Sequence, residues 1–558
     1  MTGEYVRADL LIVGGGVAGL NAALSAIGNG LDVCIADKAC VEHSGNIAGG
    51  VDHFLAYLGT GPRWDTQESY LEFTARSSTG ATDLAVVEKI YCEELPEALQ
   101  RMEDIGCSLK QPDGKYFRTQ SYGQPGPYWI NFNGKRMKPL LAKAVRAAGC
   151  RILDRVVIED LLVSQGTVCG AVGFHIREGT FHVIEAKAVL LATGGTNRLY
   201  QNPTGLSFNT WMCPVNTGES EAMAFRAGAV LANTEYLRMT VVPRGLSAAG
   251  LNALVGMGAR LLNGRGEEFM QRYDPLGTQA PRYRLAEAVL GEMKAHRGPV
   301  SMDCRHLDPA ALDHLVNTLG YDKDTLPDFF RQKGIDLAKD LLEVGPSEGM
   351  QGGPTEVCGS GVKIGPDSAT NIPGLYAAGN SADQCRSLHM AVTSGMHAGR
   401  CAAAYAAGVR ERVALPAGTL KEGYDTIFAP IDETGRSIRW QEFEDVLQRV
   451  ITEGLGPVRS APGMEKTIEG LTGLQSWFAK VRANNYHELC RVHELRNMLT
   501  VGLAMAHAAL FRQESRFGQC HYREDFPFTD DRHWQGQVLV RKGSGRDVET
   551  CFVPLNYK

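Results

Sequence analysis

The chain has 558 residues, more than one hydrophobic core normally supports, so two or three structural units are expected. Hydrophobic residues form 44% of the chain and charged residues 22%, which excludes a disordered protein and a membrane protein. The formal net charge of −6 excludes a broadly basic surface, so no nucleic-acid partner is expected.

The sequence also carries few signals for targeting or metal binding. No apolar run approaches the roughly 18 residues that cross a bilayer, so no direct membrane insertion is expected. Met1 to Leu10 lack a basic stretch followed by an apolar run, so a cytoplasmic location is the expectation. The 14 cysteines are scattered singly without a Cys-x-x-Cys pair, so we expect reduced thiols and no bound metal.

The amino-terminal segment has the pattern of strand, tight turn and helix. An apolar run over Ala8–Val13 predicts a buried strand, and an Ala/Leu-rich run over Val17–Ile27 predicts a helix. Between them, Gly14, Gly16 and Gly19 have the spacing Gly-x-Gly-x-x-Gly, which lets backbone amides and the helix amino terminus approach a diphosphate closely. The turn predicts dinucleotide binding; the alternative is a glycine-rich helix start that serves packing alone.

A second strand supports dinucleotide binding. It is predicted over Asp32–Ala36 and ends on Asp37, so that a βαβ unit is complete within about thirty residues. The Asp37 carboxylate is expected to accept hydrogen bonds from a ribose hydroxyl, and we assign Lys38 to the same site.

Two later glycine turns favour FAD over NAD. Thr193-Gly194-Gly195 follows a predicted buried strand over Ala188–Ala192, and Gly379-Asn380 follows a similar strand over Leu375–Ala378. The chain therefore leaves the nucleotide domain and returns to it, which an NAD domain does not usually need. The loop from His43 to Gly50 contains Ser44, Gly45 and Gly50, small residues that let backbone pass the flavin and its ribityl chain.

The segments around these turns predict the domain organisation. Residues 238–345 are richer in Arg, Asp, Leu and Pro, have a mainly helical pattern, and separate two glycine turns of the same type. We predict an α/β protein: a Rossmann-like FAD-binding domain over residues 1–237 and 346–412, an inserted α+β capping domain over 238–345, a C-terminal helical domain over 413–515 and a C-terminal tail over 516–558.

Motifs spread over nearly the whole chain resemble those of the succinate dehydrogenase and fumarate reductase flavoprotein family. They are the turn from Gly14 to Gly19, Ala192-Thr193-Gly194-Gly195, Ile372-Pro373-Gly374-Leu375-Tyr376-Ala377-Ala378-Gly379, Glu514-Ser515-Arg516 and His521-Tyr522-Arg523-Glu524-Asp525-Phe526-Pro527. The resemblance implies an FAD subunit whose capping domain closes over a small anionic substrate. It also implies a ferredoxin-like iron–sulfur subunit as partner.

Within this family the sequence is more similar to the alpha subunit of adenylylsulfate reductase than to succinate or fumarate enzymes. The similarity lies in Ser44-Gly45 through Ala48-x-Gly50 to Tyr57-Leu58-Gly59, in Pro112-Asp113-Gly114-Lys115-Tyr116, and in Trp211 with Pro214-Val215-Asn216. That branch interconverts an adenosine phosphosulfate with AMP and sulfite through a flavin–sulfite adduct. A similar adduct chemistry is implied here.

The sequence departs from both branches at specific positions. Val255 stands where the fumarate type is expected to have its proton-donor arginine, and Glu348-Gly349 replaces a His-Tyr pair, so fumarate reduction is disfavoured. Leu55 replaces a polar residue of the adenylylsulfate branch beside the flavin, which leaves a different substrate open. Some relatives attach FAD covalently through a loop histidine; the alignment places Ser44 there, so FAD without a covalent link is predicted, and attachment through His43 is the alternative.

Five residues are candidates for the substrate site, because an anion beside a flavin needs fixed positive charge and hydrogen-bond donors. Arg244 and Arg282 match arginines that the resemblance places near the substrate, although Arg284 competes with Arg282 and all three can be ordinary surface charges or salt-bridge partners. His53 and His389 lie close in sequence to the flavin-facing segments, and Trp211 can stack on a flavin or an adenine. The alternative for these three residues is a structural role.

Three functions are compared. The first is an FAD-dependent oxidoreductase subunit similar to adenylylsulfate reductase alpha, working with an iron–sulfur partner on a small anionic substrate. The second is a succinate- or fumarate-like enzyme that acts on another organic acid. The third is a non-catalytic FAD-binding assembly subunit, which the arginine-rich cap and the complete set of cofactor turns disfavour.

Overall fold

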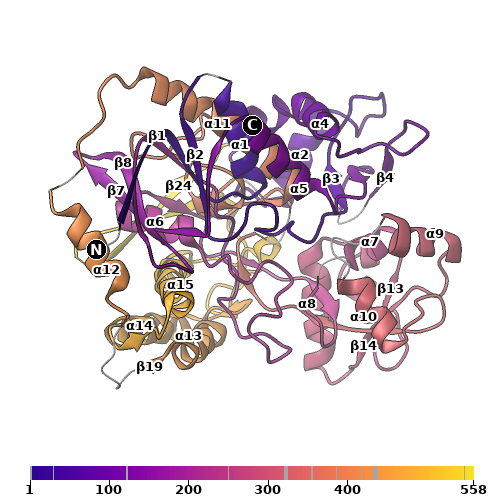
Figure 1. The fold of residues 1–558 in the computed structure, drawn as a ribbon. Helices are drawn as coiled ribbons and strands as arrows, with labels where there is room; N and C mark the ends of the chain where they lie inside the picture. Colours follow the sequence, from indigo (N-terminus) through magenta and orange to yellow (C-terminus); the bar gives the residue numbers. More distant parts are fainter. Residues whose placement is uncertain are drawn as a thin grey trace.

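The computed structural model of the chain describes residues 3–28, 30–120, 123–248, 251–319, 325–353, 356–384, 386–415, 417–431, 438–545 and 547–557, with the side chains of 318 and 319 outside this set. Figure 1 shows an α/β part at the top, a helical part at the lower left, and a third part, coloured pink, at the lower right. The mixed α/β architecture with a helical part near the carboxyl terminus agrees with the predicted fold class.

A seven-stranded sheet forms the centre of the α/β part. Its order is β6-β2-β1-β9-β8-β7. The first residues of β9 pair with β8, and its last residues pair with β18. The strands are β1 (Gly3–Val13), β2 (Val33–Asp37), β6 (Arg151–Asp154), β7 (Val156–Ser164), β8 (Thr167–His175), β9 (Phe181–Leu191) and β18 (Leu375–Ala377). The strands β6, β2, β1, β9 and β18 are parallel, so their carboxyl ends meet at one edge of the sheet.

Helices α1 (Val17–Ile27), α5 (Met137–Ala147) and α11 (Ser387–Gly408) pack beside this sheet. A Cβ atom on Gly395 or Gly399 would lie 2.4 Å from the carbonyl oxygen of Ala18 or Ala22 on α1. These two glycines therefore permit the close contact of α1 and α11, which holds the amino terminus of α1 at the edge where the strands end.

A small sheet and several helices extend the α/β part. The sheet has the order β3-β5-β4, with β3 (His53–Leu55), β4 (Phe117–Thr119) and β5 (Trp129–Asn131). The helices beside it are α2 (Gln67–Ser77), α3 (Leu84–Val87), the π-helix η1 (Glu88–Cys92) and α4 (Leu95–Asp104). The strand β3 brings His53 to the carboxyl edge of the central sheet.

Residues between Val241 and Pro346 have a separate core and contain both helices and strands. The antiparallel sheet β12-β15-β14-β13 consists of β12 (Val241–Pro243), β13 (Arg260–Leu262), β14 (Val300–Asp303) and β15 (Leu342–Pro346). It packs with α7 (Leu251–Gly256), α8 (Arg282–Lys294), α9 (Pro309–Asp313) and α10 (Thr325–Lys333), and three short helices complete it: η2 (Met270–Arg272), η3 (Gly277–Gln279) and η4 (His314–Leu319). The mixture of helices and strands agrees with the α+β class expected for this segment, although the sequence did not locate the four strands.

The carboxy-terminal part is helical and then returns to the α/β part. The helices α12 (Thr419–Phe428), α13 (Trp440–Gly454), α14 (Ala461–Phe478) and α15 (Tyr486–Phe511) share a second core with β7, β8 and β9. Three two-stranded sheets are also present: β11 (Leu237–Arg238) with β16 (Met350–Gln351), β19 (Ile438–Arg439) with β21 (Val481–Arg482), and β20 (Val458–Arg459) with β22 (Tyr522–Arg523). The strands β10 (Leu231–Ala232) and β17 (Gly361–Val362) pair with each other, and the remaining short helices are α6 (Glu219–Ala227), η5 (Gly379–Ser381), η6 (Phe517–Gln519) and α16 (Asp531–Trp534).

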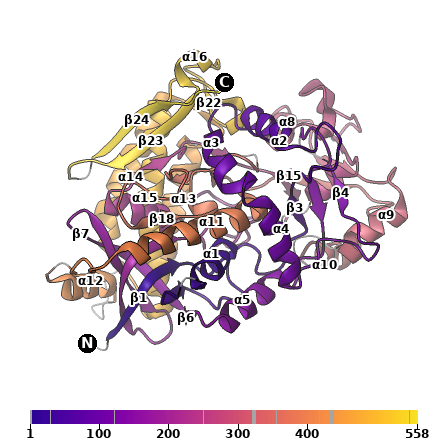
Figure 2. The ribbon, with the colours of Figure 1, turned by 90° about the horizontal axis from the view of Figure 1, so that it is seen from above.

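The tail is an ordered part of the fold. The hairpin of β23 (Gly536–Lys542) and β24 (Val548–Pro554) extends the pair of β10 and β17 to a four-stranded sheet. This hairpin is coloured yellow in Figure 2. Within the described residues no helix is long and apolar enough to span a membrane. All described cysteines are free thiols.

Candidate cofactor and substrate site

A cavity of about 300 Å³ lies at the carboxyl edge of the central sheet. The strand ends are held together there: Gly14 donates its amide to Ala36, Ala192 to Val13, and Ala378 to Leu191, at 2.8, 2.8 and 3.0 Å. All but two of the predicted cofactor residues line this cavity. The lining residues among them are Gly14, Gly16, Asp37, Lys38, Ser44, Gly45, Gly50, Thr193, Gly194, Gly379 and Asn380. Gly19 and Gly195 are not among the lining residues.

The glycines of the first turn have different tasks. Gly14 has a φ of +101°, and a Cβ atom there would lie 2.5 Å from the carbonyl oxygen of Ala192. A Cβ atom on Gly19 would lie 1.9 Å from the carbonyl oxygen of Gly14. Gly16 lines the cavity at the start of α1, where the free amides of the first helical turn favour an anion. Gly14 and Gly19 thus shape the turn, and Gly16 leaves room for the ligand.

Asp37 connects the turn with the following loop. Its carboxylate accepts hydrogen bonds from the amides of Gly15 and Ala39, both at 2.7 Å, and from the Ser44 hydroxyl at 3.0 Å. Gly45 and Gly50, with φ values of +78° and +125°, let the loop pass along the cavity. Asp37 therefore fixes two walls of the cavity in addition to the ribose contact expected from the sequence.

Lys38 joins the cavity to the helical part of the chain. Its ammonium donates to the carbonyl of Val215, to Glu219, and at 3.3 Å to Glu494 on α15. Burial lowers the pKa of Lys38, but the carboxylates of Glu219 and Glu494 outweigh this effect and raise it above the ordinary value. Lys38 is therefore a charged and partnered residue of the cavity lining.

A buried lysine that the sequence did not single out supports the first turn from below. Lys138 on α5 is fully buried, and its ammonium donates to the carbonyl of Gly15. Burial lowers the pKa of Lys138 to about 8, and the carboxylates of Asp37, Glu42 and Asp154 act in the opposite direction. The side chain therefore places a titratable positive charge beneath the turn for which the sequence predicts diphosphate binding.

FAD affinity is expected to depend on pH through Lys138. The anionic diphosphate favours the protonated lysine, so binding should weaken as the pH rises through about 8, by up to about tenfold per pH unit. We expect Lys138→Met to bind FAD more weakly at neutral pH and to lose this pH dependence. Fluorescence titration of the apoprotein with FAD measures both effects, and Lys143→Met, an exposed position on the same helix, is the control. An unchanged pH profile in Lys138→Met would contradict the assignment.

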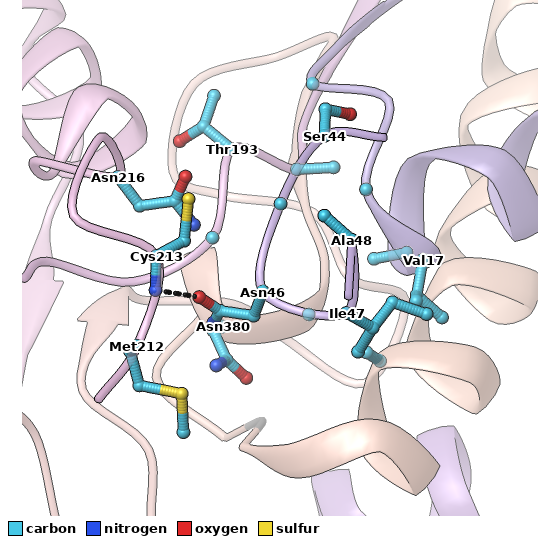
Figure 3. Close-up of a pocket in the computed structure, with 18 of the residues that line it drawn as sticks. Val17, Ser44, Asn46, Ile47, Ala48, Thr193, Met212, Cys213, Asn216 and Asn380 are labelled. Atoms are coloured by element: carbon cyan, nitrogen blue, oxygen red, sulfur yellow. Dashed lines mark hydrogen bonds between the residues drawn. The ribbon is translucent and has the colours of Figure 1, made fainter. Parts of the chain in front are cut away.

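The return turns and the loop from His43 to Gly50 enclose the middle of the cavity. Figure 3 shows Asn46, Ile47 and Ala48 on one side and Met212, Cys213 and Asn216 on the other. A hydrogen bond of 2.8 Å from the Cys213 amide to the Asn46 side-chain oxygen joins the two sides. The Ser381 hydroxyl accepts a hydrogen bond of 3.1 Å from the Gly194 amide. The hydroxyls of Thr193 and Ser220 form a hydrogen bond of 2.7 Å. Gly195 lies between Asn380 and Arg386, where a Cβ atom would be 3.3 Å from the Arg386 guanidinium.

These residues fit a flavin dinucleotide. The cavity joins a helix amino terminus and an acidic strand end to a wall of glycines and small residues, which are the features that a diphosphate, a ribose and a flat ring system require. The side-chain oxygen of Asn380 is buried, lines the cavity, and has no hydrogen-bond partner among the residues that the structure describes. His43 also lines the cavity, so the structure leaves non-covalent binding of FAD as a prediction.

The other end of the cavity contains two arginines and a carboxylate. Arg238 at the end of β11 and Arg282 at the start of α8 both contact Glu356, at 3.2 and 2.7 Å. All three side chains are buried and line the cavity. Burial raises the pKa of Glu356, but Arg282 and Arg238 outweigh this effect and hold it below the ordinary value. We call Arg238, Arg282 and Glu356 the charged triad.

The Trp211 ring contacts both arginines of the charged triad. The guanidinium groups of Arg238 and Arg282 lie 5.1 and 6.0 Å from the centre of its ring, within the range of cation–π contacts. Its indole N–H has no hydrogen-bond partner within the described part of the chain. Glu348, at the position expected to differ from the fumarate type, accepts hydrogen bonds from the Trp211 amide and the Ser247 hydroxyl at 3.0 and 2.5 Å. It therefore anchors the Trp211 segment.

The two predicted histidines lie on the same side but differ in environment. His53 lines the cavity, contacts the Asp52 carboxylate at 2.5 Å and stacks on Trp129. His389 is fully buried on α11 and does not line the cavity. Burial lowers the pKa of His389 to about 3, so its imidazole is neutral at physiological pH and cannot supply a proton as an imidazolium.

Arg244 and Arg284 lie outside the cavity. The Arg244 side chain is 71% exposed and pairs with Glu343, and Arg284 pairs with Glu287 at 3.0 Å. Of the competing arginines, the structure therefore brings Arg282 to the cavity and neither Arg244 nor Arg284. Val255, expected at the place of a proton-donor arginine, is buried in the core of the third part.

Arg244→Gln is expected to leave kcat/KM within about twofold of the native value, because exposed ion pairs contribute little. Steady-state kinetics with the substrate identified for the enzyme measure this. A loss of more than about tenfold would mean that the third part moves on substrate binding and carries Arg244 into the cavity.

The fold and the cavity define a dinucleotide-binding flavoprotein of the Rossmann-like type. The family model described as FAD binding domain matches residues 9–397, and the model described as fumarate reductase flavoprotein C-term matches residues 444–558. The chain belongs to the succinate dehydrogenase and fumarate reductase flavoprotein family and is an FAD-dependent oxidoreductase.

Individual relatives differ in their activities. L-aspartate oxidase of Streptomyces coelicolor is 30% identical over 98% of this chain and 93% of its own length. A fumarate reductase flavoprotein subunit of Mycobacterium tuberculosis is 28% identical over 100% of this chain and 98% of its own. A solved structure of adenosine-5-phosphosulfate reductase with sulfite as a covalent adduct has a TM-score of 0.89 at 24% identity, over 100% of this chain and 97% of that one.

Proposed function

We propose that the chain is the flavin-bearing subunit of a two-electron oxidoreductase that acts on a small anionic substrate. The charged triad carries this proposal. Two buried guanidinium groups beside an indole ring, at the end of the cavity opposite the diphosphate turn, are suited to hold an anion in a site shielded from water. When bound, FAD supplies the acceptor or donor of an electron pair.

The residues of the chain then act by binding and orientation. Arg238 and Arg282 hold the anionic group, the indole N–H of Trp211 offers a further donor, and His53 lines the same end of the cavity. Neutral His389 is a polar residue behind this wall, with both ring nitrogens lacking partners among the described residues. The part between Val241 and Pro346 covers the site and limits the access of water.

Electron exchange with a ferredoxin-like iron–sulfur partner completes the proposal. The relative from Mycobacterium tuberculosis is described as a flavoprotein subunit, so that protein has at least one further chain. The cysteines of this chain are scattered without a Cys-x-x-Cys pair, so an iron–sulfur cluster would have to belong to another polypeptide.

The reaction that we favour resembles that of adenylylsulfate reductase, with sulfite or a sulfur oxyanion as the reacting group. The similarity in fold to the sulfite complex and the charged triad support this choice. Reduction or oxidation of an organic acid, as in the succinate and fumarate enzymes, is the alternative.

An anaerobic titration of the oxidised holoenzyme with sulfite, and then with AMP, tests the proposal. We expect low sulfite to bleach the long-wavelength flavin band and AMP to increase the bleaching. The control is Arg282→Gln, which should keep its FAD but resist bleaching, whereas Arg284→Gln should behave as the native protein. A spectrum that sulfite leaves unchanged, together with turnover of an organic acid, would replace the sulfur chemistry with the alternative.

A further inference from the structure

Arg386 is a buried arginine next to the cofactor cavity that the proposed function does not use. It directly precedes the helix α11, and it is fully buried. The next two residues of the chain, Ser387 and Leu388, line the cavity, whereas Arg386 does not. The backbone therefore passes along the cavity while the arginine side chain lies in the protein interior beside it.

The guanidinium of Arg386 is packed against two glycines. A Cβ atom on Gly195 would lie 3.3 Å from its Nη1 atom, and a Cβ atom on Gly352 would lie 1.9 Å from its Nη2 atom. Gly195 directly follows Gly194, which lines the cavity, and the same Cβ position on Gly195 is 3.6 Å from Asn380, which also lines it. The guanidinium therefore contacts a return turn that encloses the middle of the cavity.

The positive charge of Arg386 has few partners. Its Nη2 atom donates to the carbonyl of Ser360 at 3.4 Å, and its Nε and Nη1 atoms have no hydrogen-bond partner among the residues that the structure describes. Burial lowers the pKa of Arg386, but an arginine side chain stays protonated in proteins. The carboxyl that attracts it most is Glu221, whose pKa burial raises to about 7, so this carboxyl is incompletely ionised at neutral pH.

The other groups that interact with Arg386 do not replace this missing partner. Glu356 is already paired with Arg238 and Arg282, and burial raises the pKa of the Cys358 thiol to about 12, so that this thiol is uncharged. The amino terminus of the helix α11 carries a partial positive charge, which disfavours a cation there. Arg386 is therefore costly for folding, and its charge is expected to serve the neighbouring site.

We propose that the charge of Arg386 raises the reduction potential of the bound flavin. Reduction by two electrons with uptake of one proton turns the neutral oxidised ring into an anion, and a positive charge close to the ring in a site with little water favours the anion. The electrons come from the substrate or from the partner protein, and Arg386 itself is neither oxidised nor reduced. The inference goes beyond the proposed function, because it requires bound FAD but no particular substrate.

The reduction potential of the flavin in Arg386→Gln tests the proposal. Anaerobic reduction of the holoenzyme by xanthine and xanthine oxidase, with a reference dye, gives this potential from the visible spectrum. At a given potential we expect the ratio of reduced to oxidised flavin to fall at least about tenfold, which is a shift of about −30 mV for a two-electron couple. An unchanged or higher potential in flavin-loaded Arg386→Gln would overturn the proposal.

Two further variants separate the charge of Arg386 from its shape and its helix. Arg386→Lys keeps a positive charge, so the ratio should stay within about twofold of the native value, and a potential as low as that of Arg386→Gln would show that packing sets it. Arg400→Gln removes a cation from the same helix whose side chain is 38% exposed and pairs with Glu97. It should also change the ratio less than about twofold, because water screens this charge.

A variant that lacks both buried charges keeps the test independent of the folding of Arg386→Gln. Without Arg386, the buried Glu221 carboxyl takes up a proton and offsets part of the effect. The double variant Glu221→Gln/Arg386→Gln leaves neither charge unpaired, and its ratio should lie at least about tenfold below that of Glu221→Gln. Equal potentials in these two variants would overturn the proposal.

Failure of the proposed function has a different signature. Sulfite and organic acids would then leave the flavin of the native holoenzyme unchanged, while the difference in potential between the native protein and Arg386→Gln would persist.

Discussion

Arg282→Gln is expected to lower kcat/KM by about a hundred- to a thousandfold while the protein keeps its FAD. The loss has two causes: the substrate loses a charged donor in a site with little water, and Glu356 loses the closer of its two partners, at 2.7 Å. Steady-state kinetics with an artificial electron donor measure the loss, and the flavin absorbance of the purified variant measures the FAD content.

Arg284→Gln is the matched control, because Arg284 lies two residues away on the same helix and its side chain is 36% exposed. Its activity should stay within about twofold of the native value, since a half-exposed ion pair contributes little. Similar losses in both variants would show that the helix α8 as a whole, and not the guanidinium of Arg282, is needed for catalysis.

Gly19→Ala is expected to abolish stable FAD binding. The new methyl group would lie 1.9 Å from the carbonyl oxygen of Gly14, a backbone atom that cannot move without opening the diphosphate turn. The purified protein should therefore contain less than about a tenth of the native FAD and should unfold at a lower temperature. Absorbance spectroscopy and thermal denaturation measure the two effects.

Gly28→Ala provides the control at the other end of the same helix. Gly28 has a φ of −58°, and a Cβ atom there meets no other atom within 4 Å. Alanine should leave FAD binding unchanged and raise the free energy of unfolding by about 0.5 kcal/mol, because it favours the helix more than glycine does. Full FAD content in Gly19→Ala would show that the turn adapts, and would weaken the role assigned to its glycines.

The cofactor end of the site was predictable because its signals are local. The strand, glycine turn, helix and acidic strand end lie within one short stretch, and the structure confirms strands ending at Val13 and Asp37 and a helix over Val17–Ile27. The return turns were recognisable for the same reason, since each follows its own buried strand. Backbone geometry at Gly14 and packing at Gly19 explain why these positions are glycine.

The substrate end was less predictable because its residues come from distant segments. Arg238 and Glu356 are 118 positions apart and meet through a ladder of only two residue pairs. Lys138 and Gly15 are 123 positions apart, and nothing in the sequence around Lys138 marks it as buried. The one available signal was that Glu356 is the only charged residue in the sequence of the loop over residues 352–360.

The sequence predicted an α+β third part but did not locate its strands, for a related reason. They are three to five residues long, and β12 pairs with β15 about a hundred positions later. Short strands with distant partners give little periodicity, whereas the helices between them give a clear one. The tail is similar, because β23 reaches its partner β10 across about three hundred positions.

The contact between Lys38 and Glu494 has a consequence for the biogenesis of the protein. The two residues are separated by 456 positions, so a ribosome that adds about 5–20 residues per second takes roughly 20–90 seconds to make the second after the first. During this interval β9 and then β18 are synthesised and can join the sheet. Glu494, however, is absent until the end of the interval. FAD is therefore expected to be loaded late, onto a nearly full-length chain, so truncated chains should accumulate as flavin-free protein.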